Sequence, residues 1–346
     1  MGIETGWPLE RPMSPQAQDQ WLGFVPDRFD PAGRGGVADD GSHTVTFVEG
    51  ESRYVYDKQI ILAVNLALAA DRPLLVAGPP GGGKSTLAAN VAAILSRRFY
   101  KRVVTSRMAA ADLLWSFDAL RRLNDAQAAR GDKELPPRAA YVEPQILWWA
   151  FDPDSARLRG AKDVPEPTPP DGVREALDAV VLLDEIDKAE PDVPNDLLVP
   201  LDERRFDVLD LERPVTVQAN RNVLTIITTN GERELPHAFM RRCVFLELAP
   251  IRREWLTRIA DDRFGEDGHE LHAELAEKMM PMIEAAARRR LRAASTAEYL
   301  DTIQACKTLG IRDFAAPSSD VWRQVRQAML WKQDEKDLPP DQPDAS

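Results

Sequence analysis

The sequence predicts an α/β fold built on a largely parallel sheet, followed by a helical lobe. Apolar runs with strand character occur at 74–77, 180–183, 223–228 and 243–248, and helical stretches separate them along the chain. Strands that alternate with helices are typical of a parallel sheet whose faces the helices cover. After Arg252 the pattern is mostly helical, which predicts a separate lobe of helices.

The composition is that of an ordinary globular protein. Of 346 residues, 44% are hydrophobic and 29% are charged, which excludes a collagen-like or wholly disordered chain. The 2 cysteines are too few for a disulfide framework, so we expect a reducing, cytoplasmic setting. No apolar run approaches the ~20 residues of a membrane span, so we expect no membrane partner. The net charge of -12 makes nucleic acid an unlikely partner, although a local basic patch could still bind it.

Changes in residue pattern divide the chain into an arm, an α/β domain, a lid and a tail. Residues 1–50 are rich in Pro, Gly and Asp and are expected to form an irregular arm. Residues 51–250 contain the predicted sheet, with an insertion within about 101–175 that is rich in aromatic residues. Residues 251–332 form the expected helical lobe, and 333–346, which are polar and acidic, are expected to be disordered.

Two helices are expected beside the first strand of the sheet. Ile60, Val64 and Leu68 recur at helical spacing after Asp57, a candidate N-cap. The second helix is predicted over residues 84–100, directly after a glycine-rich segment. Strand, loop and helix therefore follow one another in that order.

The glycine-rich segment fits the phosphate-loop pattern G-x-x-x-x-G-K-[ST]. Its candidate binding residues are Gly78, Pro79, Pro80, Gly81, Gly82, Gly83, Lys84, Ser85 and Thr86. Backbone N–H groups of such a loop point at phosphate oxygens, and the next helix directs its positive end to the same place. Lys84 is expected to reach the β and γ phosphates, and Ser85 to offer its hydroxyl to Mg²⁺. The alternative is a glycine-rich turn that binds nothing.

Two adjacent carboxylates follow the apolar run 180–183. Ligands of open α/β sheets bind at the carboxyl ends of the strands. We therefore expect Asp184 to hold the Mg²⁺ shell and Glu185 to orient and deprotonate the attacking water. The alternative is that Asp184 or Asp187 only caps a helix that starts near Pro191.

Three further polar residues follow the strand at 223–228. Asn230 is a candidate sensor that hydrogen-bonds the attacking water or the γ phosphate, although Asn also favours turns for local reasons. Arg241 and Arg242 end a short helix that begins at Pro236. One of them, with Arg242 preferred, is expected to be an arginine finger that enters a neighbouring subunit's site. The alternative is a helix end that the macrodipole favours by itself.

The order of these motifs resembles an AAA+ ATPase core, and more narrowly the MoxR-like branch with an insertion in helix 2. The resemblance rests on the phosphate loop, on LLDEID at 182–187, on TIITTN at 225–230 and on LPHAFMRRC at 235–243. It implies a sheet of strand order 5-1-4-3-2, a helical lid, and ATP with Mg²⁺ bound between subunits of a ring, usually a hexamer. It also implies that Tyr56, ahead of the first strand, borders the adenine.

The expected lid departs from the family pattern at one position. In many relatives the first turn of a lid helix carries an arginine that contacts the γ phosphate. Here Ser295 and Glu298 are placed to form a capping box, and that turn contains no arginine. Arg292 is the nearest replacement.

Taken together, these features predict a Mg²⁺-dependent ATPase that remodels a bound protein. The resemblance implies a partner with a von Willebrand factor A domain. A McrB-like nucleic-acid motor and a nucleotide-gated adaptor in a bacterial defence or signalling complex stay open as alternatives. Trp115, Trp148 and Trp149 of the insertion are expected to be core or subunit-contact residues, with a client-gripping loop near the ring pore as the alternative.

Overall fold

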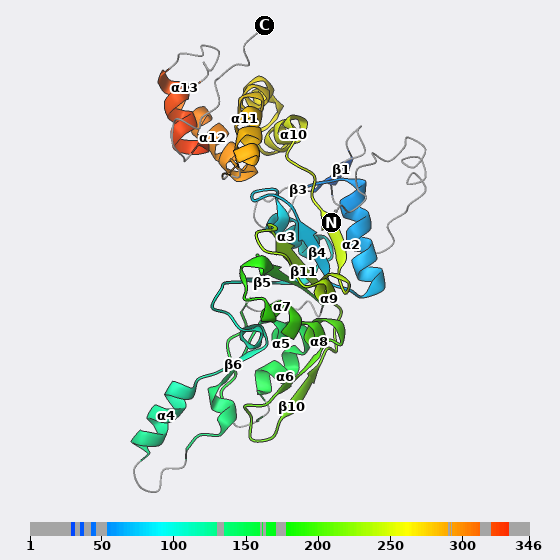
Figure 1. Cartoon of the computed structure of the whole chain (residues 1–346), viewed down its shortest axis with the longest axis vertical. Helices are drawn as coiled ribbons and strands as arrows, with labels where there is room; N and C mark the ends of the chain where they lie inside the picture. The colour runs from blue at the N-terminus through cyan, green and yellow to red at the C-terminus, as the bar shows by residue number, and fades with distance from the viewer. Residues whose placement is uncertain are drawn as a thin grey trace, which may run out of the picture.

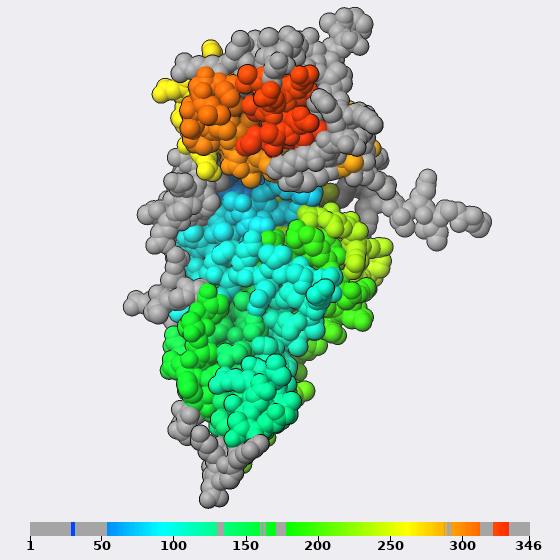
Figure 2. Space-filling view, turned by 90° about the vertical axis from the view of Figure 1, so that its left-hand side faces the viewer, coloured from blue at the N-terminus to red at the C-terminus, as the bar shows by residue number. Residues whose placement is uncertain are grey.

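The computed structural model describes most of the chain between residues 29 and 331. The described residues are 29–31, 35–37, 43–45, 54–129, 135–159, 161, 164–170, 178–289, 291, 293–311 and 320–331. The expected tail, most of the expected arm and Arg292 lie outside them. The helical lobe, the sheet and the insertion follow one another along the long axis of the molecule (Figures 1 and 2). No helix in the described ranges combines the length and apolarity that a bilayer span requires.

A parallel sheet of five strands forms the centre of the molecule. Its strands are β4 (Leu74–Ala77), β5 (Arg98–Val103), β8 (Ala179–Asp184), β11 (Val223–Thr229) and β12 (Val244–Glu247). Their order across the sheet is β12-β4-β11-β8-β5. Numbered along the chain, this is the predicted order 5-1-4-3-2, which is confirmed. Every residue of β8 and β11 is buried, as expected for strands covered on both faces.

Helices α2 (Lys58–Ala70) and α3 (Lys84–Ile94) pack beside the sheet. The predicted N-cap of α2 is confirmed, because the Asp57 carboxylate accepts a 2.8 Å hydrogen bond from the Ile60 N–H. The predicted helix over 84–100 is too long. α3 ends at Ile94, Ser96 takes a positive φ of 54° that breaks the helix, and residues 98–103 pair with β8 as edge strand β5.

Part of the expected arm is ordered. A small antiparallel sheet contains β1 (Gly35–Val37), β2 (His43–Val45) and β3 (Tyr54–Tyr56). Phe29 is buried, and the side chain of Asn65 on α2 binds its backbone at both ends. The Phe29 N–H donates to Asn65 Oδ1 at 3.0 Å, and Asn65 Nδ2 donates to the Phe29 carbonyl at 2.9 Å.

The insertion between β5 and β8 packs against one face of the sheet. It contains η3 (Ala110–Leu113), β6 (Trp115–Phe117), α4 (Ala119–Ala128), η4 (Arg138–Tyr141), β7 (Val142–Pro144), α5 (Ile146–Phe151) and α6 (Pro153–Leu158). β6 and β7 pair antiparallel, and α4 projects from the far end (Figure 1). Trp148 and Trp149 are buried in the core, whereas Trp115 is partly buried and stacks on Phe206. The two buried tryptophans therefore do not form a client-gripping loop.

Six short elements lie along the chain between β8 and β12 in addition to β11. They are η5 (Ile186–Lys188), α7 (Asp192–Asp196), α8 (Leu198–Asp202), β9 (Arg205–Val208), β10 (Val215–Gln218) and α9 (His237–Met240). β9 and β10 form an antiparallel hairpin between the strand that carries the acid pair and β11.

The C-terminal helices form a lid with its own hydrophobic core. They are α10 (Arg253–Phe264), η6 (Glu266–Gly268), α11 (His269–Arg289), α12 (Thr296–Leu309), α13 (Asp320–Val325) and η7 (Arg326–Leu330). The predicted capping box at the start of α12 is present, with Ser295 and Glu298 bonded in both directions. α12 ends at Gly310, which takes the left-handed conformation.

Replacement of Asn65 tests how the ordered part of the arm is held. Asn65→Ala should lower the free energy of unfolding by about 2–4 kcal/mol, because two buried backbone groups of Phe29 lose their partner. The neighbouring Leu66 is 48% exposed, so Leu66→Ala should change stability by only about 0.5 kcal/mol. Chemical denaturation measures both, and equal losses would contradict the assignment.

Candidate nucleotide-binding site

A cavity of about 480 Å³ lies between the carboxyl ends of the strands and the lid. From the sheet side, residues 80–86, Asp184, Glu185 and Asn230 line it. From the lid side, it is lined by Trp255, Ile259, Arg263, Ser295, Thr296, Ala297, Leu300 and Asp301. Motifs that are more than 100 residues apart in the sequence therefore meet at one cavity.

Two glycines of the phosphate loop are required by geometry. Gly81 has a φ of 76°, and a Cβ there would lie 2.3 Å from the Cβ of Ser295 in the lid. Gly83, the N-cap of α3, has a φ of 84° and packs against the ring of Tyr54. A side chain at either position would strain the loop, and one at Gly81 would also push the lid away. Gly78 and Pro79 do not line the cavity, but their carbonyls contact Lys84.

Lys84 is buried, with 6% of its surface exposed. Its ammonium donates to the carbonyls of Gly78 at 2.7 Å and Pro79 at 2.8 Å. Burial lowers the pKa of Lys84, and nearby carboxylates, Asp184 first, partly offset this effect. An ammonium has three donors, so two carbonyl bonds leave one for a phosphate oxygen.

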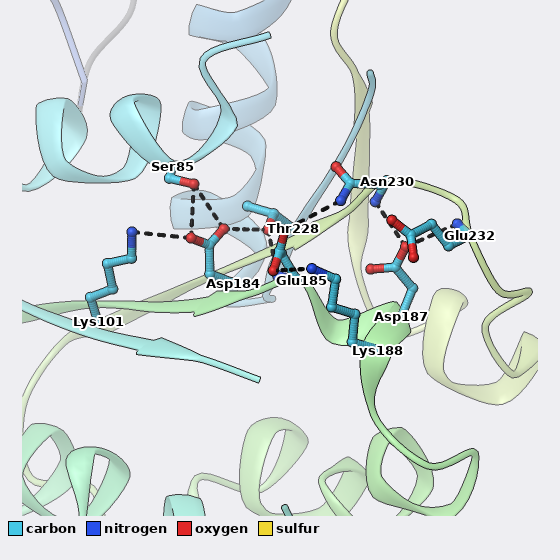
Figure 3. Close-up of polar contacts among 9 residues, drawn as sticks. All are labelled: Ser85, Lys101, Asp184, Glu185, Asp187, Lys188, Thr228, Asn230 and Glu232. Atoms are coloured by element: carbon cyan, nitrogen blue, oxygen red, sulfur yellow. Dashed lines mark hydrogen bonds and ion pairs between the residues drawn. The ribbon is translucent and has the colours of Figure 1, made fainter. Parts of the chain in front are cut away.

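Asp184 is at the centre of a polar cluster (Figure 3). Ser85 Oγ lies 2.8 and 2.9 Å from its two oxygens, Thr228 Oγ1 donates at 2.7 Å, and Lys101 Nζ lies at 3.1 Å. Burial alone would raise the pKa of Asp184. Hydrogen bonds from Thr228, Ser85 and Lys101, together with the charge of Lys101, outweigh burial and lower that pKa. The carboxylate is therefore ionised at neutral pH.

The oxygens of Ser85 and Asp184 fit a magnesium ion. Mg²⁺ prefers hard oxygen ligands and usually takes only one or two from the protein, with substrate phosphates and water completing its shell. Across the described part of the chain, no group of three or more His, Cys, Asp and Glu could hold a metal. The donor set thus suits a metal that arrives together with phosphates.

Glu185 has an unusual backbone conformation. Its φ of 63° and ψ of 50° are left-handed, which is costly for a residue other than glycine and is often found at functional sites. Its N–H donates to Thr228 Oγ1 at 2.9 Å. Its carboxylate lies 2.6 Å from Lys188 Nζ and 3.5 Å from Asn230 Nδ2, and the bond to Glu185 raises the pKa of Lys188. The structure therefore brings Glu185 and Asn230 together as the sequence predicts.

Asp187 holds the loop after β11 and caps no helix. Its Oδ2 accepts hydrogen bonds from the N–H groups of Asn230 and Glu232, each at 3.0 Å. α7 begins after Pro191 without a side-chain cap. The alternative interpretation of Asp184 and Asp187 as helix caps is therefore wrong.

The expected place of Tyr56 is wrong. Tyr56 is fully buried, and its hydroxyl donates to Asn90 Oδ1 on α3 at 2.7 Å, inside the core. Tyr54 and Val55 of the same strand line the cavity in its place. The resemblance pointed to the right segment of the chain, but only packing decides which of its side chains lines the cavity.

Arg241 and Arg242 do not line the cavity of their own chain. Both are exposed at the end of α9. Arg242 Nε lies 3.3 Å from Asp202 Oδ2, and its Nη1 donates to the Ala238 carbonyl at 3.1 Å. Any contact of theirs with a nucleotide must therefore be made to another chain, as an arginine finger requires.

Sequence reasoning missed several residues at the site. Thr228 lies within the apolar run of β11, where its hydroxyl gave no separate signal. Lys101 directly follows the segment 84–100 that was predicted to be helical, at the start of the expected insertion. Arg263 of α10 lines the cavity from the lid. Arg263 belongs to a stripe with Trp255 and Ile259 at four-residue spacing, which was a readable pattern on one face of the helix.

Comparison with known proteins identifies the class of the α/β domain. Residues 73–243 match the profile of the AAA domain, dynein-related subfamily. This segment contains the phosphate loop, the acid pair, Asn230 and both arginines, within a fold that has the AAA+ strand order. Residues 73–243 thus resemble an AAA domain in sequence and have the P-loop AAA+ fold.

Comparison with solved structures and with curated proteins gave the following results. A mutant of RuvB from Thermotoga maritima is 13% identical, and the match covers 78% of this chain and 80% of that chain with a TM-score of 0.39. A search of curated proteins found no match.

The contact of Gly81 with the lid can be tested by a pair of alanine substitutions. Gly231 has a similar φ of 73° but nothing within 4 Å of a Cβ, so Gly231→Ala adds only strain, about 1–2 kcal/mol. Gly81→Ala adds the same strain and also a clash with Ser295. Hydrogen exchange of the amides at 296–300 should rise in Gly81→Ala alone. Equal exchange in both variants would contradict a tight lid contact.

Proposed function

We propose that the chain hydrolyses ATP with Mg²⁺ and uses the resulting conformational cycle to remodel a bound protein. The observation that supports this most directly is that Lys84, Ser85, Asp184, Glu185 and Asn230 surround one cavity beneath the lid. One cavity is thus lined by residues whose chemistry suits phosphate binding, metal binding and water activation.

Each residue at the cavity has a role that its contacts support. The loop N–H groups and Lys84 would bind the phosphates, and Ser85 and Asp184 would hold Mg²⁺. When bound, the metal neutralises charge on the phosphates. Glu185 would accept a proton from the attacking water as the bond to the γ phosphorus forms and ADP leaves. Lys188 and Asn230 orient its carboxylate.

The lid contact supports a mechanical use of the cycle. Gly81 of the phosphate loop lies directly against Ser295, the first residue of the capping box of α12. A nucleotide in the cavity would touch both bodies at once, so its binding and loss would move the lid against the sheet.

We further propose a ring in which Arg242 or Arg241 reaches a neighbour's nucleotide. Their exposure and their position outside their own cavity support this arrangement. The MoxR-like resemblance of the sequence suggests a hexamer, and a protein with a von Willebrand factor A domain is the first client to test.

Substitution of Glu185 tests the catalytic assignment. Glu185→Gln keeps the shape but removes the base, so ATP hydrolysis should fall by about 10²-fold or more while ATP affinity changes little. Glu190→Gln, which changes an exposed residue of the same loop, is the control. Phosphate release and nucleotide titration measure the two quantities. Unchanged ATP hydrolysis in Glu185→Gln would contradict the assignment of Glu185 as the base.

Mixing of subunits tests the arginine finger. Arg242→Ala chains and Lys84→Ala chains should each be inactive, whereas mixtures should regain part of the activity because intact Arg242 then meets intact Lys84 across an interface. Asp202→Ala, which removes the ion pair but keeps Arg242, should stay active as a control. A lack of rescue at every mixing ratio would count against a shared site.

A further inference from the structure

Lys101 contacts the candidate metal site from the edge of the sheet. In the parallel pairing of β5 with β8 it lies opposite Leu182, two residues before Asp184. Its side chain extends along the strand end so that Nζ lies 3.1 Å from Asp184 Oδ2 (Figure 3). The Lys101 side chain is 44% exposed, whereas that of Asp184 is 9% exposed. A partly exposed cation is therefore paired with a nearly buried carboxylate.

The acceptor positions of Asp184 are occupied. Thr228 donates to Oδ1, and the single hydroxyl hydrogen of Ser85 is shared between Oδ1 and Oδ2. Oδ2 is also paired with the ammonium of Lys101. A divalent cation or its bound water would need to approach this same carboxylate, next to Ser85.

Electrostatic repulsion disfavours the presence of both the Lys101 ammonium and Mg²⁺ at Asp184. A positive charge a few ångströms from a Mg²⁺ ion opposes the binding of that ion, and the low exposure of Asp184 weakens the screening by water on its side. When no metal is bound, the same lysine stabilises the charge of Asp184. Lys84 also acts on Asp184 through its charge, but its ammonium donates its hydrogen bonds to the loop carbonyls of Gly78 and Pro79.

We infer that Lys101 is a resident counter-ion that competes with the divalent cation for Asp184 and thereby sets the Mg²⁺ concentration that nucleotide binding requires. This inference rests on the proposed function, since it takes Ser85 and Asp184 as the metal-binding residues. Lys101 thus acts as a positioning residue for Asp184, and its charge opposes the arrival of the metal at that carboxylate.

The experiment measures binding and does not depend on turnover. Binding of a fluorescent ADP analogue to the full chain is titrated with Mg²⁺ for the wild type and for Lys101→Met. The half-saturating Mg²⁺ concentration should be about three- to tenfold lower in Lys101→Met. Lys101→Arg, which keeps the charge, should retain the wild-type value. Lys58→Met, the same change at an exposed lysine outside the cavity lining, should also retain it.

A second readout covers the case in which Lys101→Met folds poorly. Lys101→Gln keeps a polar head and loses the charge. Its melting temperature in EDTA should be below that of the wild type, and the increase on addition of Mg²⁺ and ADP should be larger.

Each other outcome is decisive. An unchanged or higher Mg²⁺ requirement in both neutral variants overturns the inference. The inference is also overturned if Lys101→Met and Lys101→Gln bind ATP more weakly but keep the wild-type ADP affinity and Mg²⁺ requirement. That result would indicate that Lys101 binds the γ phosphate of ATP. A wild-type chain that binds no nucleotide at any Mg²⁺ concentration would refute the proposed function, and the inference with it.

Discussion

The site depends on hydrogen bonds among Ser85, Asp184 and Thr228. These residues come from the first turn of α3, the end of β8 and the end of β11. The bonds fix the phosphate loop to the two central strands, and Thr228 also accepts the N–H of Glu185. One cluster therefore sets the position of the loop, the candidate metal ligand and the candidate base.

Each acidic group at the strand ends is held by more than one partner. Asp184 is paired with Lys101, Glu185 with Lys188, and Asp187 with the backbone of the loop after β11. Three carboxylates within four residues would otherwise repel one another at a partly buried place. Their separate partners orient the three carboxylates differently, which lets neighbouring residues take different chemical roles.

The lid is joined to this centre through small residues. Ser295 meets Gly81, where no side chain would fit, and the apolar residues of α10 form the other wall of the cavity. The lid has a hydrophobic core of its own, separate from the two clusters that contain the residues of the sheet. Tight contact at one point and independent packing elsewhere are what a nucleotide-driven movement requires.

The sequence by itself determined the features that are local. The phosphate loop, the acid pair after an apolar strand and the capping box at Ser295 are each written in a few consecutive residues, because their chemistry needs fixed spacing. The strand order was also predictable, since it followed from the resemblance that the order of motifs carries.

Tertiary structure alone decided the contacts between distant segments. Residues 98–103 form an edge strand because β8 offers a partner, although the local pattern suggested a longer helix. Tyr54 faces the cavity and Tyr56 the core because Asn90 of another helix binds the Tyr56 hydroxyl. The pairs Lys101–Asp184 and Gly81–Ser295 join segments 83 and 214 residues apart. Such contacts depend on how whole elements pack, and no short pattern of residues specifies them.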